Sequence, residues 1–212
     1  PYDPDVRYST KRSVGWAGYK VHLTETCDPG LPHLIAHAET TPATTPDWNQ
    51  AQPIHAALAR KALLPDEHLR DGGYVDAGTL VAARAAHQVT VVGPVPPDTS
   101  WQAQAGRGFD LGGFLLDWDA RRATCPQGTG STKWSSTHAT DGAAIINVRF
   151  PAAACRVCPA RADCTTSATG GREITVRPQP EHLAVQEARA AQLTPAFKAR
   201  YDPRAGIEGT LS

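Results

Sequence analysis

The stretch EHLRDGGYVDAGTLVAARAAHQVTVV, residues 67–92, decides the fold class of this chain. Its first part, residues 67–74, is short and extended and ends in a pair of glycines followed by tyrosine. Residues 76–88 carry apolar side chains at helical spacing and predict an amphipathic helix. The β-branched run at residues 89–95 is typical of a buried strand. Strand, helix and strand at this spacing predict a βαβ crossover, and therefore an α/β core.

Further segments before this unit are predicted to extend the same core. Residues 1–13 are polar and predict a loop. Residues 16–26 alternate apolar and polar side chains with the period of a half-buried strand, and residues 33–41 predict a second strand in a hairpin or meander. Residues 46–64 place apolar side chains at helical spacing, and Pro53 is expected to kink this helix or to mark its start.

The amino-acid composition of the sequence changes after the βαβ unit. Residues 94–178 are rich in Gly, Pro and Thr and contain only short apolar runs, which favours a mostly β insertion. From Pro180 the pattern becomes helical again. We therefore expect three parts: a core at 1–93, a β-rich insertion at 94–178, and C-terminal helices at 179–212 that return to the core.

Charge and apolar content narrow the class of protein. The 212 residues include 21 basic and 21 acidic side chains, so no global field attracts nucleic acid, and any polyanion must be held by local patches. No apolar run approaches the roughly 20 residues that span a bilayer, and no signal peptide is visible, so a cytoplasmic protein without a membrane partner is expected. The chain starts at Pro1 and has no methionine, which predicts a fragment of a longer protein.

Asp71 is the first candidate for chemistry. It follows the short strand and precedes Gly72 and Gly73. In open α/β sheets ligands bind beyond the carboxyl ends of strands, and paired glycines let a substrate approach the backbone closely. The alternative is a turn aspartate that bonds its own backbone.

A second candidate group lies at the C-terminus. Tyr201, Arg204 and Glu208 fall within about 60° of one face if the segment is an ideal helix. The alternative is an Arg–Glu pair on a solvated surface, with little energetic weight. Because Asp202 and Pro203 resemble a helix start, Tyr201 is also a candidate for a place just outside that helix.

Four of the five cysteines lie in one window of the insertion: Cys125, Cys155, Cys158 and Cys164. The Cys-x2-Cys spacing suits a zinc knuckle, and Cys164 and Cys125 are the candidate third and fourth ligands, with His138 as a substitute. The alternative is a set of reduced, buried thiols. A catalytic zinc is not expected, because no His-Glu-x2-His motif is present.

The order of these segments resembles the C-terminal part of a bacterial insertion-sequence transposase of the DDE type. Six blocks carry the resemblance and together cover nearly the whole chain: DPDVRYSTKR (3–12), WAGYKVHLTETCD (16–28), LIAHAETTPATTPD (34–47), DGGYVDA (71–77), CRVCPARADCT (155–165) and RAGIEGTLS (204–212). The resemblance implies a ribonuclease-H-like mixed sheet with helices, interrupted by the β-rich, cysteine-containing insertion.

The resemblance also implies a mechanism and a partner. In this family two Asp and one Glu hold two Mg²⁺ ions for DNA cleavage and strand transfer. Asp71 matches the second Asp, with Gly72 replacing the commoner alanine, and the segment from Tyr201 to Glu208 matches a Tyr-x2-Arg-x3-Glu signature. Arg204 and Tyr201 are then expected to contact DNA phosphates.

The departures from the family pattern matter as well. No segment matches the first Asp, which is expected upstream, so the fragment is predicted to be inactive alone and the intact protein to be a homodimer. Two rival interpretations stay open. One is a zinc-stabilised DNA-binding module without catalysis, and the other is a related metal-dependent nuclease that cleaves without joining.

Overall fold

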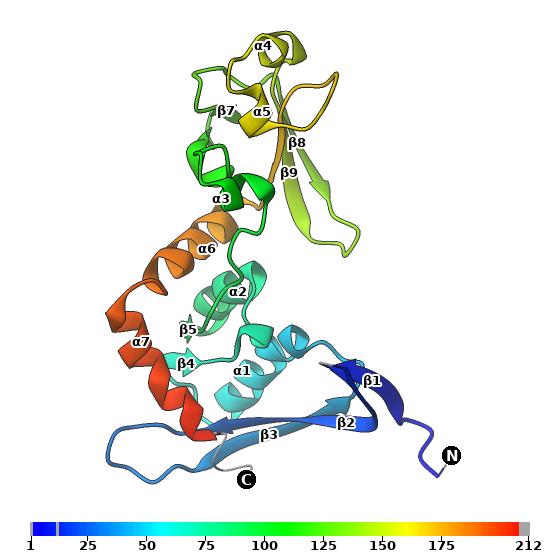
Figure 1. Cartoon of the computed structure of the whole chain (residues 1–212). Coiled ribbons are helices and arrows are strands. Elements are labelled where there is room, and N and C mark those ends of the chain that lie inside the picture. Colours follow the sequence, from blue (N-terminus) through cyan, green and yellow to red (C-terminus); the bar gives the residue numbers. More distant parts are fainter. Residues whose placement is uncertain (1, 12, 208–212) are drawn as a thin grey trace. The chain divides into compact units, whose positions relative to one another are not determined.

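The computed structural model describes residues 2–11 and 13–207, and its fold is a mixture of helices and several small sheets (Figure 1). The chain divides into two compact units. The first comprises Pro1–Val95 and Ala184–Ser212, and the second comprises Pro96–Leu183. The chain passes between the units after Val95 and again after Leu183, and the second passage falls within a helix.

The first unit begins with an antiparallel sheet in the order β1-β2-β3. Strand β2 (Val14–Glu25) pairs through its first half with β1 (Arg7–Lys11) and through its second half with β3 (Ile35–Pro42). The predicted pair of strands is thus confirmed. The prediction of a loop for residues 1–13 is wrong, because strand β1 occupies part of this segment. Strand β1 is exposed on both faces, so its sequence shows no apolar alternation, and only its pairing with β2 defines it.

The predicted βαβ unit is confirmed. Strands β4 (Glu67–Leu69) and β5 (Thr90–Val92) pair in parallel, and α2 (Ala77–His87) connects them. The Asp76 side chain caps α2 by accepting from the Thr79 N–H at 2.6 Å, and Gln88 ends it in the left-handed conformation.

A second helix packs against α2. Helix α1 (Ala51–Arg60) follows a 3₁₀ turn, η1 (Asp47–Gln50). Pro53 lies in the first turn of α1, where no intrahelical hydrogen bond needs its missing N–H, so the helix continues through it. Ile54 and Leu58 of α1 are buried, as are Ala83, Val89 and Val92 of the βαβ unit.

The C-terminal part of the chain is helical, as expected. Helix α6 (Gln179–Ala191) is followed by α7 (Pro195–Tyr201), whose first turn is capped by the Thr194 hydroxyl accepting from the Phe197 N–H at 3.2 Å. A 3₁₀ turn, η4 (Asp202–Ala205), comes next. Tyr201 and Arg204 therefore do not share one α-helix, because Pro203 cannot donate to the preceding turn.

The second unit combines short strands with short helices. Strands β6 (Leu115–Asp117) and β7 (Arg122–Thr124) form a hairpin, and β8 (Lys133–His138), β9 (Ala144–Arg149) and β10 (Glu173–Val176) form an antiparallel sheet in the order β10-β9-β8. Its helices are α3 (Trp101–Ala105), η3 (Leu111–Gly113), α4 (Ala152–Arg156) and α5 (Arg161–Cys164).

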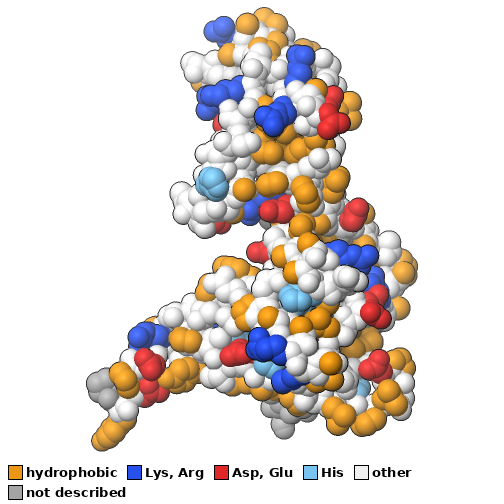
Figure 2. Space-filling view, turned by 180° about the vertical axis from the view of Figure 1, so that it is seen from behind, with side chains coloured by type: hydrophobic (Ala, Val, Ile, Leu, Met, Phe, Trp, Pro, Cys, Tyr) orange, Lys and Arg blue, Asp and Glu red, His pale blue; other side chains and the backbone are white. Residues whose placement is uncertain are grey.

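The core of the second unit is small. Its buried members are Phe114, Ala123, Val148, Phe150, Ile174 and Val176. Several Lys and Arg side chains are exposed on the face of this unit seen in Figure 2. In the part of the chain that the structure describes, no helix is both long and apolar enough to cross a membrane.

Candidate active site

Asp71 lies directly beyond strand β4 and is exposed to solvent. The ladder continues for one residue past the strand, because the Arg70 N–H donates to the Val92 carbonyl at 2.8 Å. Asp71 Oδ1 then accepts from the Gly72 N–H at 2.8 Å and opens a 3₁₀ turn, η2 (Gly72–Tyr74). The turn interpretation is thus correct for one oxygen, while the carboxylate as a whole remains open to solvent at the strand end.

Helix α7 brings the C-terminal segment to this strand end. The Tyr201 hydroxyl donates to the Arg70 carbonyl at 3.1 Å, across 131 positions of sequence. Arg200, one residue earlier, forms a two-pronged ion pair with Glu67 of β4, with Nε 2.7 Å from Oε2. These contacts place the end of α7 beside the residue that precedes Asp71.

The pKa of Tyr74, at the end of η2, is affected by charged side chains from several parts of this site. Burial raises the pKa of Tyr74 to about 12, and the carboxylates of Asp47 and Asp71 act in the same direction. The cations of Arg70 and Arg204 oppose that rise in pKa. Arg204 and Asp71 therefore both lie within electrostatic reach of the Tyr74 ring, although sequence spacing alone does not relate them.

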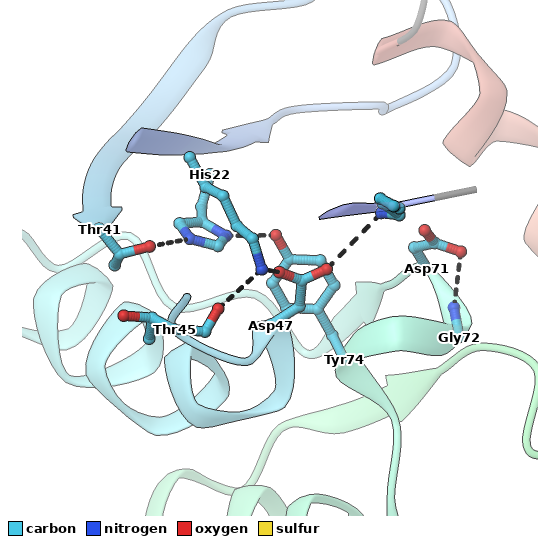
Figure 3. A network of polar contacts seen from close by, with 9 residues as sticks. His22, Thr41, Thr45, Asp47, Asp71, Gly72 and Tyr74 are labelled. Atoms are coloured by element: carbon cyan, nitrogen blue, oxygen red, sulfur yellow. Dashed lines mark hydrogen bonds and ion pairs between the residues drawn. The ribbon is translucent and has the colours of Figure 1, made fainter. Parts of the chain in front are cut away.

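A polar network from the antiparallel sheet holds Tyr74 (Figure 3). His22 of β2 lies between two hydroxyls, bonding Thr41 Oγ1 at 2.9 Å through Nε2 and the Tyr74 hydroxyl through Nδ1. His22 is buried, and burial lowers its pKa, so the ring is neutral at pH 7. Asp47 is bound by Lys20 at 2.9 Å, and Lys20 also donates to the Thr45 carbonyl.

A buried cation lies beneath the candidate site. Arg70 is 4% exposed, and its Nη2 donates to the Ala51 carbonyl at 3.1 Å and contacts His55 Nε2 at 3.0 Å. Its Nε donates to His68 Nδ1 at 3.4 Å, and its Nη1 has no hydrogen-bond partner in the described part of the chain. Burial lowers the pKa of Arg70 to about 10, which leaves it charged at pH 7.

The two histidines beside Arg70 are held neutral. Burial, and next the Arg70 cation, lower the pKa of His55 to about 4 and that of His68 to about 3. Neither histidine was predicted from the sequence to be functional. One indication of this cluster was present in the sequence. His68 and Arg70 are two residues apart along a strand, so their side chains are expected on the same face. Nothing in the sequence indicated that His55 of α1 packs against them.

The predicted Mg²⁺ ligands are only partly observable. Asp71 offers a hard oxygen donor in an exposed position, the donor type that Mg²⁺ prefers, whereas Glu208 lies outside the described residues. Among residues 2–11 and 13–207, no three His, Cys, Asp or Glu side chains are already arranged to hold a metal ion.

The second unit brings together all four cysteines of the predicted cluster. Cys125, Cys155, Cys158 and Cys164 line one cavity of about 30 Å³, with Arg161 and Arg172. The alternative ligand His138 is exposed at the end of β8 and does not line that cavity. Cys125 and Cys164 thus line the same cavity as the Cys-x2-Cys pair, which leaves their role as zinc ligands a prediction.

Comparison with known proteins adds one finding. Residues 124–212 match the model of a protein family described as a transposase DDE domain. This part of the chain is therefore similar to the DDE transposases, the family that the sequence resembles. The matched span contains Tyr201, Arg204, Glu208 and the four clustered cysteines, and Asp71 lies before it. Searches of the curated proteins and of the solved structures found no match.

The match supports the family predicted from the sequence. DDE transposases process DNA with a divalent metal, typically Mg²⁺, and their domain implies a ribonuclease-H-like fold. The mixed α/β elements around Asp71 agree with such a fold at the level of class. The exposed carboxylate of Asp71 is chemically suited to Mg²⁺, but one carboxylate is fewer than the several ligands that such an ion needs.

Proposed function

We propose that this protein is a transposase that cleaves DNA at the ends of an insertion sequence and joins the ends to target DNA, with Asp71 and Glu208 as metal-binding carboxylates. One observation carries the proposal. The hydrogen bond from Tyr201 to the Arg70 carbonyl fastens the first residue of the Tyr-x2-Arg-x3-Glu segment beside the residue that precedes Asp71. Tyr201 and Arg70, which are 131 positions apart in the sequence, are thus in direct contact.

Each side chain has a distinct role in this proposal. When bound, two Mg²⁺ ions supply activation of a water or 3′-hydroxyl and stabilisation of the leaving oxygen in an in-line phosphoryl transfer. Asp71 and Glu208 hold the ions, together with at least one further carboxylate, since two ions need more than two. Arg204 binds a DNA phosphate. Tyr201 positions the segment through Arg70 rather than binding phosphate, because its hydroxyl proton already has an acceptor.

The proposal is tested by the products formed on DNA. The intact protein is incubated with duplex DNA carrying the element ends and a target plasmid, with Mg²⁺ or with a chelator. We expect nicked ends and joined products with Mg²⁺ and neither with the chelator. Cleavage without joining favours the metal-dependent nuclease, and tight binding without any strand scission favours the non-catalytic DNA-binding module.

A basic hollow in the second unit supports DNA as the partner. Arg121, Arg122 and Lys133 line it with Ser131, Thr132 and Trp134. The ion pairs in this unit involve other arginines, namely Arg107, Arg149 and Arg177, and all three hollow cations are exposed. Asp117 stands opposite Arg122 across the hairpin and offsets part of that charge. The remaining cations and hydroxyl groups suit a phosphodiester backbone.

Replacing Arg121, Arg122 and Lys133 together with glutamine is expected to weaken duplex binding and to flatten its salt dependence. Each lost phosphate contact lowers the slope of log K against log salt by about 0.9, so the slope falls by about 2 to 3. Fluorescence anisotropy from 50 to 200 mM salt measures it. Arg149→Gln is the matched control, because Glu173 already neutralises Arg149, with Nε 2.6 Å from Oε2. Equal slopes in the triple variant and the wild type would remove this surface from the proposal.

A further inference from the structure

The second unit lacks a core large enough to explain its order by apolar burial alone. Its core contains six buried residues, and its strands are only three to six residues long. Units with small cores are commonly reinforced by disulfides or by a structural metal. Cys125, Cys155 and Cys164 pack against this core as partly buried side chains, and all five cysteines of the chain are free thiols.

The four clustered thiols reach one cavity from three separate places in the fold. Cys125 follows strand β7, Cys155 lies in α4, Cys158 lies in the loop after α4, and Cys164 ends α5. The cavity they line has a volume of about 30 Å³. That volume accommodates an ion or a water molecule and is far too small for an organic cofactor.

The backbone is folded around two of the sulfurs. The Thr129 N–H donates to Cys125 Sγ at 3.3 Å, inside a turn closed by the Gly128 N–H donating to the Cys125 carbonyl at 2.8 Å. Gly128 adopts a φ of +79°, which side-chain-bearing residues rarely take. The Arg172 N–H reaches Cys155 Sγ at 3.5 Å. Each of these two sulfurs therefore has a backbone N–H as hydrogen-bond donor.

Two arginines at the cavity lack acceptors. Arg161 Nη1 and Arg172 Nε are buried and have no hydrogen-bond partner within the described residues, although Arg161 Nη2 donates to three carbonyls. A buried cationic N–H without an acceptor is costly. The carboxylates nearby do not remove this cost: Asp163 pairs with Arg107, and Asp98 acts on Arg172 only as a more distant charge. A negatively charged group inside the cavity would offset the buried charge of these two arginines.

We propose that Cys125, Cys155, Cys158 and Cys164 bind one structural Zn²⁺ as thiolates, with Arg161 and Arg172 neutralising the resulting centre. Four thiols release four protons to solvent as the ion binds, so the tetrathiolate centre carries a charge of −2, which two guanidinium groups offset. The sulfurs are not yet arranged as a ligand set, so binding draws them to about 2.3 Å from the ion.

This site is independent of DNA chemistry. A tetrathiolate zinc has no open position for a reacting group, so it stabilises the fold and takes no part in phosphoryl transfer. It ties the β6–β7 hairpin to α4 and α5, three elements that otherwise share only a few buried side chains. The zinc can therefore be established or refuted whether or not the protein joins DNA.

Metal content and thermal unfolding of the intact protein, purified without chelators, test the inference. We expect about one zinc per chain, and cobalt(II) substitution should give the intense sulfur-to-metal charge-transfer absorption of a thiolate site. Removing zinc with a strong chelator should lower the unfolding midpoint by about 10 °C, and adding zinc back should restore it.

Cys158→Ser is expected to lose most of the bound zinc, whereas Cys27→Ser, which alters the one cysteine outside the cluster, should retain it. Should Cys158→Ser fail to fold, the cobalt spectrum of the wild type still decides the question. Zinc-free protein with an unchanged midpoint, cobalt binding without the charge-transfer band, or an intact mass lacking two hydrogens per cysteine pair would each overturn the site.

Discussion

Asp71→Asn is expected to reduce Mg²⁺-dependent strand cleavage by about 1,000-fold or more in the intact protein, which corresponds to about 4 kcal/mol of transition-state stabilisation. Asparagine keeps an oxygen that accepts from the Gly72 N–H, so the turn after β4 is preserved. It removes the negative charge that a divalent ion requires. The measurement is single-turnover cleavage of end-labelled duplex, with Mg²⁺ varied up to tens of millimolar.

Asp66→Asn is the matched control for this variant. Asp66 immediately precedes the first residue of β4 and is exposed. Its backbone carbonyl accepts from the Thr90 N–H, and the change of side chain leaves this hydrogen bond in place. We expect near wild-type cleavage from it. If Asp71→Asn cleaves as fast as Asp66→Asn while both fold normally, Asp71 is only a turn residue and the proposed active site is wrong.

Acidification between pH 6.5 and 4 is expected to destabilise the first unit by about 3 kcal/mol through His55 alone. His55 is fully buried, and burial and the neighbouring Arg70 lower its pKa to about 4. The unfolded chain binds a proton near pH 6.5, whereas the folded protein does not until about pH 4. The unfolded state therefore gains protons first as pH falls, and the stability present at neutral pH is lost over that window.

Urea unfolding at intervals from pH 7.5 to 4, followed by circular dichroism, measures this loss. His138→Gln is the control, because His138 is exposed on the second unit and should leave the pH dependence unchanged. His55→Gln should be less stable at pH 7 but should show a flatter pH dependence than the wild type. A pH profile identical in wild type and His55→Gln would show that this buried histidine does not control acid stability.

Local patterns were sufficient for the elements that frame the candidate site. The βαβ unit was predictable because the strand ends, the Asp76 cap and the apolar periodicity all lie within residues 67–92. The position of Asp71 beyond a strand followed from the same stretch. Strand β1 was not predictable, because its polar residues are defined by pairing with β2 rather than by burial.

Other features of the site depend on residues that sequence patterns do not connect. The signature segment was expected on a single helix or, as the alternative, on a helix that starts at Asp202 and leaves Tyr201 outside it. The structure is closer to the alternative, because α7 ends at Tyr201 and Arg204 lies in a separate 3₁₀ turn. The buried Arg70 and its neutral histidines escaped notice, since a cation without a carboxylate partner resembles an exposed strand residue in sequence. The contact made by Tyr201 was not predictable either, because its hydrogen-bond acceptor is a backbone carbonyl that no side-chain motif reveals.

By itself, the sequence determined the family resemblance, the βαβ core, and the residue types suited to metal and phosphate chemistry, because each depends on neighbours within one or two turns or strands. Only the tertiary structure decided that α7 lies against β4, that Arg70 is buried beneath Asp71, and that four cysteines share one cavity. Those facts depend on packing and ion pairing between segments tens to more than a hundred residues apart, and such contacts leave no periodic trace in either segment.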